Sequence, residues 1–146
     1  MQIPNPNYFA PSSFGSLELR QRPGNEFIGQ PIDYTDNTVG IRKMTLDELN
    51  LPRVDFIKID IEGMEMEALV GARETIKTYR PILLIEKIKT DARLLEYWLK
   101  DNGYQLMALG INILAVHQSD ESWKDITPPQ SAGQHAETRG LATMNA

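Results

Sequence analysis

Two strand-like runs separated by one helical segment restrict the fold of this chain more than any other feature. The first run, residues 54–61, is rich in β-branched and aromatic residues and is followed by Glu62-Gly63 and a helix that ends near residue 77. The second run, residues 81–86, is almost wholly apolar, which is typical of a strand buried on both faces of a parallel sheet. One apolar stripe lies on the helix at the i, i+3 and i+7 positions, Leu69, Ala72 and Ile76. Because parallel strands need such a crossover, this order predicts an α/β fold.

The pattern continues with one more helix and two more strands. A helix is expected over residues 91–102, and it meets Gly103 where a C-terminal cap belongs. Strands are expected at residues 104–109 and 113–117, and the turn Gly110-Ile111-Asn112 between them favours a hairpin. The expected architecture is a sheet of parallel strands joined by right-handed crossover helices and ending in an antiparallel hairpin.

The chain outside this pattern divides into an irregular N-terminal part and a C-terminal tail. Residues 1–38 are rich in Pro, Asn, Gly and Ser, so we expect an irregular insertion with short strands near residues 16–19 and 26–28. The α/β domain is expected to span residues 39–117. Residues 118–146 have little periodic apolar content and are expected to be a largely disordered tail, with one anchor at Trp123.

A short helix is expected near the start of the α/β domain, after a strand at residues 39–43. Thr45 and Glu48 have the spacing of a capping box, in which each side chain accepts a hydrogen bond from the other residue's backbone N–H. Pro52 should end this helix.

Composition excludes several classes of function. The chain has 146 residues, enough for one domain, with a formal charge of −5 and no cysteine. Without cysteine, disulfide frameworks, thiolate zinc sites and cysteine nucleophiles are excluded, and a reducing cytoplasm fits. The negative charge gives no general attraction to nucleic acid, and no apolar run approaches the ~20 residues that span a bilayer. We therefore expect a cytoplasmic protein that binds neither nucleic acid nor membrane.

Three carboxylates are placed where an α/β sheet is expected to bind its ligand. In open parallel sheets, ligands lie beyond the carboxyl ends of the strands. Asp60 and Glu62 follow the first strand, and Glu86 ends the second. If the extended backbone continues through the turn, Lys58, Asp60 and Glu62 share one face of the strand, and Gly63 allows the turn into the helix. The three carboxylates are candidates to hold a divalent cation, or one is a general base whose pKa its neighbours raise.

A structural role competes with the catalytic one at each position. Asp60, Glu62 and the two glutamates that follow them are favoured near a helix N-terminus by the helix dipole alone. Lys58 is unusual in the middle of an apolar strand, so we expect an ion pair with one of the carboxylates, which would need only to hold the fold. His117 is a candidate base or a solvated strand end, and His135 lies in the expected tail.

The motifs around these residues resemble those of one known family. Residues 58–65 have the form K-x-D-x-E-G-x-E, Gly71-Ala72 follow on the helix, and residues 80–86 have the form R-P-x-x-x-x-E. Together with Thr45-Leu46-Asp47 upstream, they resemble the FkbM family of S-adenosylmethionine-dependent methyltransferases. The resemblance covers residues 8–117. It departs from the family at Ser13 and Lys87, where an asparagine is usual in the family.

The resemblance implies a class I methyltransferase fold, which is Rossmann-like, and methyl transfer from S-adenosylmethionine to a hydroxyl group of a small molecule such as a sugar or natural product. Asp60, Ile61 and Glu62 would lie at the cofactor. Asp60, Glu62 or Glu86 would position or deprotonate the hydroxyl, with Lys58 beside them.

One departure qualifies this expectation. The family's first three strands carry the glycine-rich cofactor loop, whereas no two glycines of this chain have the G-x-G spacing, so the chain is expected to hold only the back half of the domain. The strand at residues 54–61 would then have an unpaired apolar edge, which we expect a homodimer or the missing N-terminal half to cover. Two alternatives remain open, a non-catalytic interaction subunit and a carboxylate metal site without the cofactor.

Overall fold

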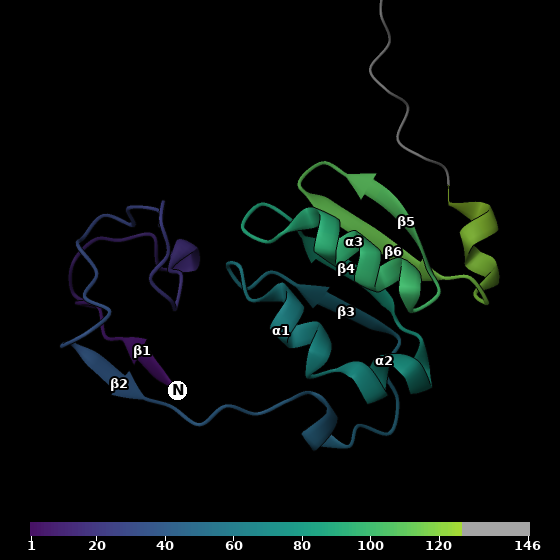
Figure 1. Ribbon diagram of the computed structural model, residues 1–146, viewed down its shortest axis with the longest axis horizontal. Helices are drawn as coiled ribbons and strands as arrows, with labels where there is room; N and C mark the ends of the chain where they lie inside the picture. The colour runs from purple at the N-terminus through teal and green to yellow at the C-terminus, as the bar shows by residue number, and fades with distance from the viewer. Residues whose placement is uncertain (127–146) are drawn as a thin grey trace, which may run out of the picture.

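The computed structural model describes residues 1–126 and contains two β-sheets (Figure 1). The smaller sheet is the antiparallel pair β1 (Gln2–Pro4) and β2 (Thr38–Gly40). The larger sheet has the strand order β3 (Phe56–Ile59), β4 (Ile82–Glu86), β6 (Asn112–His117), β5 (Tyr104–Leu109). The helices are α1 (Glu65–Val70), α2 (Arg73–Tyr79) and α3 (Ala92–Asp101), with 3-10 turns η1 (Phe14–Ser16), η2 (Asp47–Leu49) and η3 (Glu121–Asp125).

The larger sheet is mixed. β3 and β4 are parallel, with Phe56 opposite Ile82 and Ile59 opposite Ile85. β6 is antiparallel to both of its neighbours, β4 and β5. The predicted α/β class, the parallel pair with its helical connection and the antiparallel hairpin are therefore confirmed. The hairpin turn contains only Gly110 and Ile111, since Asn112 already pairs with Leu109.

One predicted helix is in fact two. The helix is interrupted at Gly71-Ala72, between α1 and α2, because the segment around η2 packs against these two residues. A Cβ on Gly71 would lie 3.2 Å from Cγ2 of Thr45. The Asp47 carboxylate accepts hydrogen bonds from Thr75 N at 2.8 Å and from Glu74 N at 3.1 Å, which satisfies the first free N–H groups of α2.

The predicted capping box is confirmed. Thr45 N donates to the Glu48 carboxylate at 2.7 Å, and Glu48 N donates to Thr45 Oγ1 at 3.2 Å. The helix that it caps is the 3-10 turn η2, which ends at Asn50 in the left-handed conformation before Pro52 is reached.

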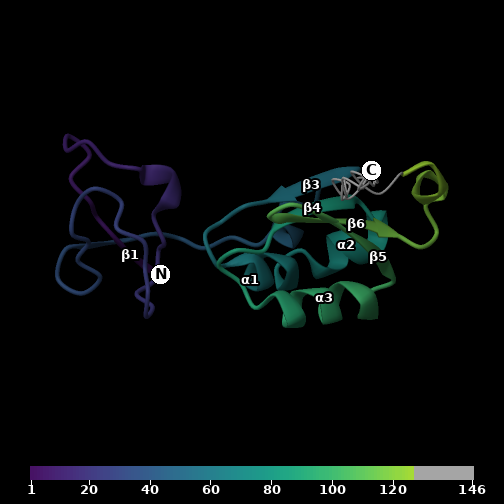
Figure 2. The same ribbon diagram turned by 90° about the horizontal axis from the view of Figure 1, so that it is seen from above.

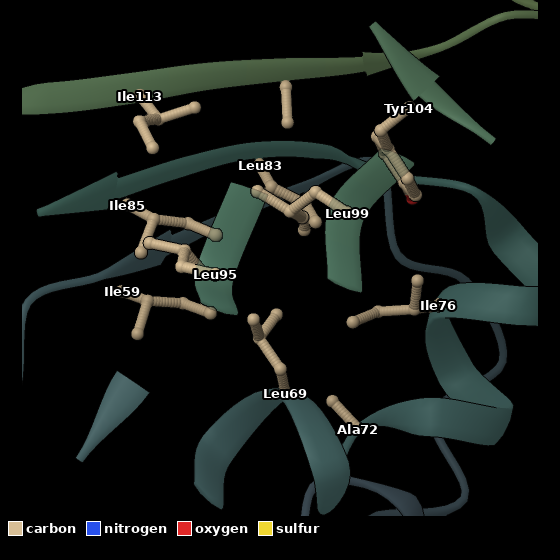
Figure 3. Close-up of a cluster of buried hydrophobic side chains, with 11 residues drawn as sticks. Ile59, Leu69, Ala72, Ile76, Leu83, Ile85, Leu95, Leu99, Tyr104 and Ile113 are labelled. Carbon is tan, nitrogen blue, oxygen red and sulfur yellow. The ribbon is translucent and has the colours of Figure 1, made fainter. Parts of the chain in front are cut away.

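The hydrophobic core lies between the sheet and its three helices (Figure 3). α1 and α3 lie on the same side of the sheet (Figure 2), and Ile76 of α2 belongs to the same core. The buried cluster is Ile59, Leu69, Ala72, Ile76, Leu83, Ile85, Leu95, Leu99, Tyr104, Ile113 and Ala115.

The prediction that residues 81–86 are buried on both faces is wrong. Leu83 and Ile85 point into the core and are fully buried, whereas Ile82 and Leu84 on the second face are partly exposed. The reason is that the helices cover one face of β4, so burial alternates along the strand.

The ends of the chain also differ from expectation. Residues 16–19 and 26–28 are not strands. They are held instead by isolated contacts such as the hydrogen bond from Ser13 N to Ile28 O at 2.7 Å. The strand predicted at residues 39–43 is only partly present as β2. Residues 118–126, predicted as tail, include η3 with Trp123, and residues 127–146, including His135, lie outside the described residues.

Candidate functional site

The candidate site lies at the carboxyl ends of β3 and β4. β3 ends at Ile59, and Asp60 follows it directly, while Glu86 is the last residue of β4. The arrowheads of both strands point toward the N-terminal segment, residues 1–40 (Figure 1). This end of the sheet is therefore bordered by the segment that precedes the α/β domain.

Lys58, Asp60 and Glu86 form one group on the open face of the sheet. Ile59 is opposite Ile85 in the parallel register, which places Asp60 beside Glu86. Lys58 is two residues before Asp60 on the same side of the strand, and its ammonium group forms an ion pair with the Asp60 carboxylate. The predicted ion pair of Lys58 is confirmed. Its side chain and that of Asp60 are half exposed, so the pair contributes little to the stability of the fold.

The two carboxyl groups have pKa values that are shifted in opposite directions. The hydrogen bond with Asp60, burial, and the negative charges of Asp60, Glu62 and Glu65 raise the pKa of Glu86 to about 7. The hydrogen bond with Glu86 and the contacts with Lys58 lower the pKa of Asp60. Because the groups titrate as a pair, one proton is shared between them, and it is lost near neutral pH.

Glu62 is not part of this group, and the prediction that it shares a strand face with Lys58 and Asp60 is wrong. The strand ends at Ile59, and the backbone turns at Glu62 and Gly63, with φ of 56° and 89°. This turn directs the Glu62 carboxylate to Lys89, whose Nζ lies 2.6 Å from it. The extended backbone needed for a period of two does not continue past the strand.

The buried side chain of Glu65 stabilises the same turn through hydrogen bonds. Its side chain is buried, and Oε1 accepts hydrogen bonds from Gly63 N at 3.0 Å and Ile61 N at 3.4 Å. Glu65 therefore has a structural role, and the N–H groups that it binds belong to the turn before α1. Ile61 is 40% exposed at the surface of the turn.

Lys89 connects the site to the N-terminal segment. Its Nζ lies 3.1 Å from Glu26 and 3.5 Å from Glu18, in addition to its contact with Glu62. Burial opposes its protonation, but the hydrogen bonds to Glu62 and Glu26 outweigh this effect and raise the pKa of Lys89. A partly buried ammonium beside three carboxylates is charged throughout the physiological pH range.

Arg22 forms a second connection and explains why residue 63 is glycine. The guanidinium donates to Gly63 O at 2.7 Å. A Cβ on Gly63 would lie 2.9 Å from Lys89 O and would clash with the Arg22 guanidinium. Together with the positive φ, this close approach requires glycine.

The sequence pattern predicts neither Lys89 nor Arg22 as a residue of the site. The contact between Lys89 and Glu26 joins residues 63 positions apart, and both basic residues lie in loops without a motif. The one sequence feature that could have indicated a role for Lys89 is its place shortly after β4, a strand that ends at the expected ligand side of the sheet.

The three predicted carboxylates do not assemble into a metal site. Among residues 1–126, no group of three or more His, Asp or Glu side chains is arranged to hold a metal ion. The physical reason is the turn at Glu62, which leaves only Asp60 and Glu86 together, with Lys58 already supplying a positive charge.

The backbone donors of the turn between β3 and α1 are already used within the protein. Asp60 and Glu86 are available to a polar ligand, but the N–H groups of Ile61 and Gly63 are occupied by Glu65. Two pockets, of about 130 Å³ and 300 Å³, lie elsewhere, and neither is lined by Asp60, Glu62 or Glu86. The cofactor contacts of Asp60, Ile61 and Glu62 stay predictions.

His117 lies at the opposite end of the sheet from the site. Glu86 is opposite Asn112 at one end of β6, and His117 is the last residue at the other end. It is therefore not a base for the Asp60–Glu86 pair.

A protein-family model matches most of the chain. The model of the Methyltransferase FkbM domain matches residues 3–106, which include both strands of the site and most of the N-terminal segment. The chain belongs to the FkbM methyltransferase family. Searches of the curated proteins and of the solved structures find no match. Among the described residues, 1–126, no helix is long and apolar enough to cross a membrane.

Proposed function

We propose that this FkbM-family chain supplies the acceptor-activating carboxylates of an S-adenosylmethionine-dependent O-methyltransferase. The observation that carries the proposal is the Asp60–Glu86 pair, in which the pKa of Glu86 is raised to about 7. A general base is most effective when its pKa lies near the working pH. Above pH 7, the Glu86 carboxylate accepts the proton of a bound hydroxyl group, whose oxygen thereby becomes the nucleophile.

Asp60 and Lys58 set the pKa of Glu86 and orient the acceptor. The negative charge of Asp60 keeps the proton affinity of Glu86 high, and Lys58 holds Asp60 in place through their ion pair. Glu62, held by Lys89, shapes the turn beside the pair. S-adenosylmethionine, when bound, supplies the methyl group. The rate enhancement from the described residues comes from placing the acceptor and removing its proton.

The sheet supports a class I methyltransferase fold in which β3 to β6 are strands four to seven. The cofactor-binding strands would then pair with the free edge of β3. Within residues 1–126, β3 is hydrogen-bonded to β4 alone, and Phe56 on it is 53% exposed. The lack of cysteine favours a reducing cytoplasm as the place of the reaction.

The same edge supports a second candidate, an interaction subunit that forms a homodimer through β3 without binding cofactor. An unpaired apolar edge strand favours association with another chain. Phe56→Lys places a charge on this edge and should abolish such a dimer, as measured by sedimentation velocity over a range of protein concentrations.

Calorimetry with S-adenosylmethionine separates the two candidates. We expect the full chain to bind the cofactor with micromolar affinity if it is competent for methyl transfer. No binding, together with a concentration-dependent dimer that Phe56→Lys disrupts, would favour the interaction subunit and contradict the enzymatic proposal for the chain alone.

A further inference from the structure

A second polar site lies at the end of the sheet opposite the Asp60–Glu86 pair. A pocket of about 130 Å³ is lined by Ile76 and Lys77 of α2, by Arg80 after it, and by Asn102 and His117. Two of these side chains are cationic and none is acidic. We propose that this pocket binds a phosphate group.

The imidazole of His117 is held so that one N–H group is left for a ligand. Ser119 N donates to Nδ1 at 3.2 Å, and Ser119 Oγ lies 2.7 Å from the same nitrogen. Nδ1 is therefore the acceptor, and in the neutral ring the proton is on Nε2. Nε2 lies beside Gly103, where a Cβ would come within 2.9 Å of it, and it has no hydrogen-bond partner among residues 1–126.

The guanidinium of Arg80 is hydrogen-bonded to the same residue, Ser119. Its Nη1 donates to Ser119 Oγ at 3.2 Å, so one hydroxyl group orients both the guanidinium and the imidazole. The backbone of Arg80 has φ of 50°, the left-handed conformation that ends α2. The planar guanidinium is well suited to bind two oxygens of one phosphate.

Charges of both signs lie near His117, and the positive ones come from residues that line the pocket. Burial and the positive charge of Arg80 lower the pKa of His117, while the negative charge of Asp120 opposes the shift. Tyr104 also faces the ring, edge-on at 5.4 Å between centroids, but its hydroxyl donates to Pro81 O. Neither Lys77 nor Arg80 forms an ion pair within residues 1–126, so their charges are available to a bound dianion.

The pocket size restricts the ligand. A volume of about 130 Å³ accommodates one phosphate group but not a nucleotide. The group can belong to inorganic phosphate or to the end of a phosphate monoester that extends into solvent. Both ligands offer the same oxygens to Arg80, Lys77 and His117 Nε2–H.

The test is an NMR titration of the full chain with inorganic phosphate, in which sodium chloride keeps the ionic strength constant. We expect saturable shifts of the His117 ring signals, assigned by comparison with His117→Gln, and a higher pKa for His117 in the bound state. Methyl phosphate is titrated in parallel. Equal affinity for both ligands supports binding of a monoester, and a preference for inorganic phosphate supports binding of the free ion.

Matched variants identify the pocket. Arg80→Gln and Lys77→Gln should each lower the phosphate affinity about tenfold, because each removes a charge-assisted hydrogen bond. Arg93→Gln removes the same charge at the other end of α3, about 13 Å along the helix from Asn102, and should leave the affinity unchanged. Backbone amide spectra verify the fold of each variant. Shifts that do not saturate, or an equal loss of affinity in Arg93→Gln, would overturn the proposal.

Discussion

Glu86→Gln is expected to lower kcat/KM for methyl transfer by about 10²- to 10⁴-fold at pH 8, which is the usual contribution of a general base. Glutamine keeps the size of the side chain but cannot take a proton from the acceptor. The measurement is the transfer of a labelled methyl group from S-adenosylmethionine to hydroxyl acceptors. Glu121→Gln, which makes the same change on the exposed turn η3, is the control and should keep wild-type activity.

The pH dependence distinguishes a base from a structural residue. In the wild type, kcat/KM should rise with pH and reach half of its maximum near pH 7, because Glu86 is active only after it loses its proton. In Asp60→Asn, the charge that raises the pKa of Glu86 is gone, so the midpoint should move to lower pH. An unchanged midpoint in Asp60→Asn, or near wild-type activity in Glu86→Gln, would contradict the assignment.

Lys89→Met is expected to release residues 16–28 from the α/β domain. The substitution leaves the carboxylates of Glu18, Glu26 and Glu62 without their shared cation. Hydrogen bonds to charged groups contribute about 1.5–3 kcal/mol, so the open state of this segment should become ~10- to 100-fold more populated. Amide hydrogen exchange across residues 16–28 measures this population directly.

Lys87→Met is the matched control for Lys89→Met. It removes the same charge two residues earlier, from a side chain that contacts none of the three carboxylates. Exchange in residues 16–28 should match the wild type in this variant. If Lys89→Met exchanges no faster than Lys87→Met, Lys89 does not hold the N-terminal segment on the site.

The sequence predicts the parts of the fold that depend on local pattern. The parallel pair β3 and β4, the helix α3 before Gly103, and the hairpin all follow from periodicity and turn residues within short windows. The break between α1 and α2 does not, because it depends on Asp47 and Thr45 packing from a distant part of the chain.

The candidate site was predicted in part for the same reason. Asp60 and Glu86 come together because strand ends meet in a parallel pair, and that register follows from the two apolar runs. The position of Glu62 is not predicted correctly, because a period-two pattern gives no sign of its positive φ. Gly63, which also has a positive φ and is closely packed, belongs to the same turn. Lys89 was missed because its carboxylate partners are distant in sequence.

The proposed chemistry depends on a proton that Asp60 and Glu86 share at the ends of two parallel strands. Carbon-13 NMR titration of the side-chain carboxyl groups in the full chain tests it most directly. We expect Glu86 to titrate near pH 7, and Asp60→Asn to bring its midpoint down toward the ordinary glutamate range. A Glu86 midpoint near 4.5 in the wild type, unchanged by Asp60→Asn, would show that the two carboxyl groups do not share a proton.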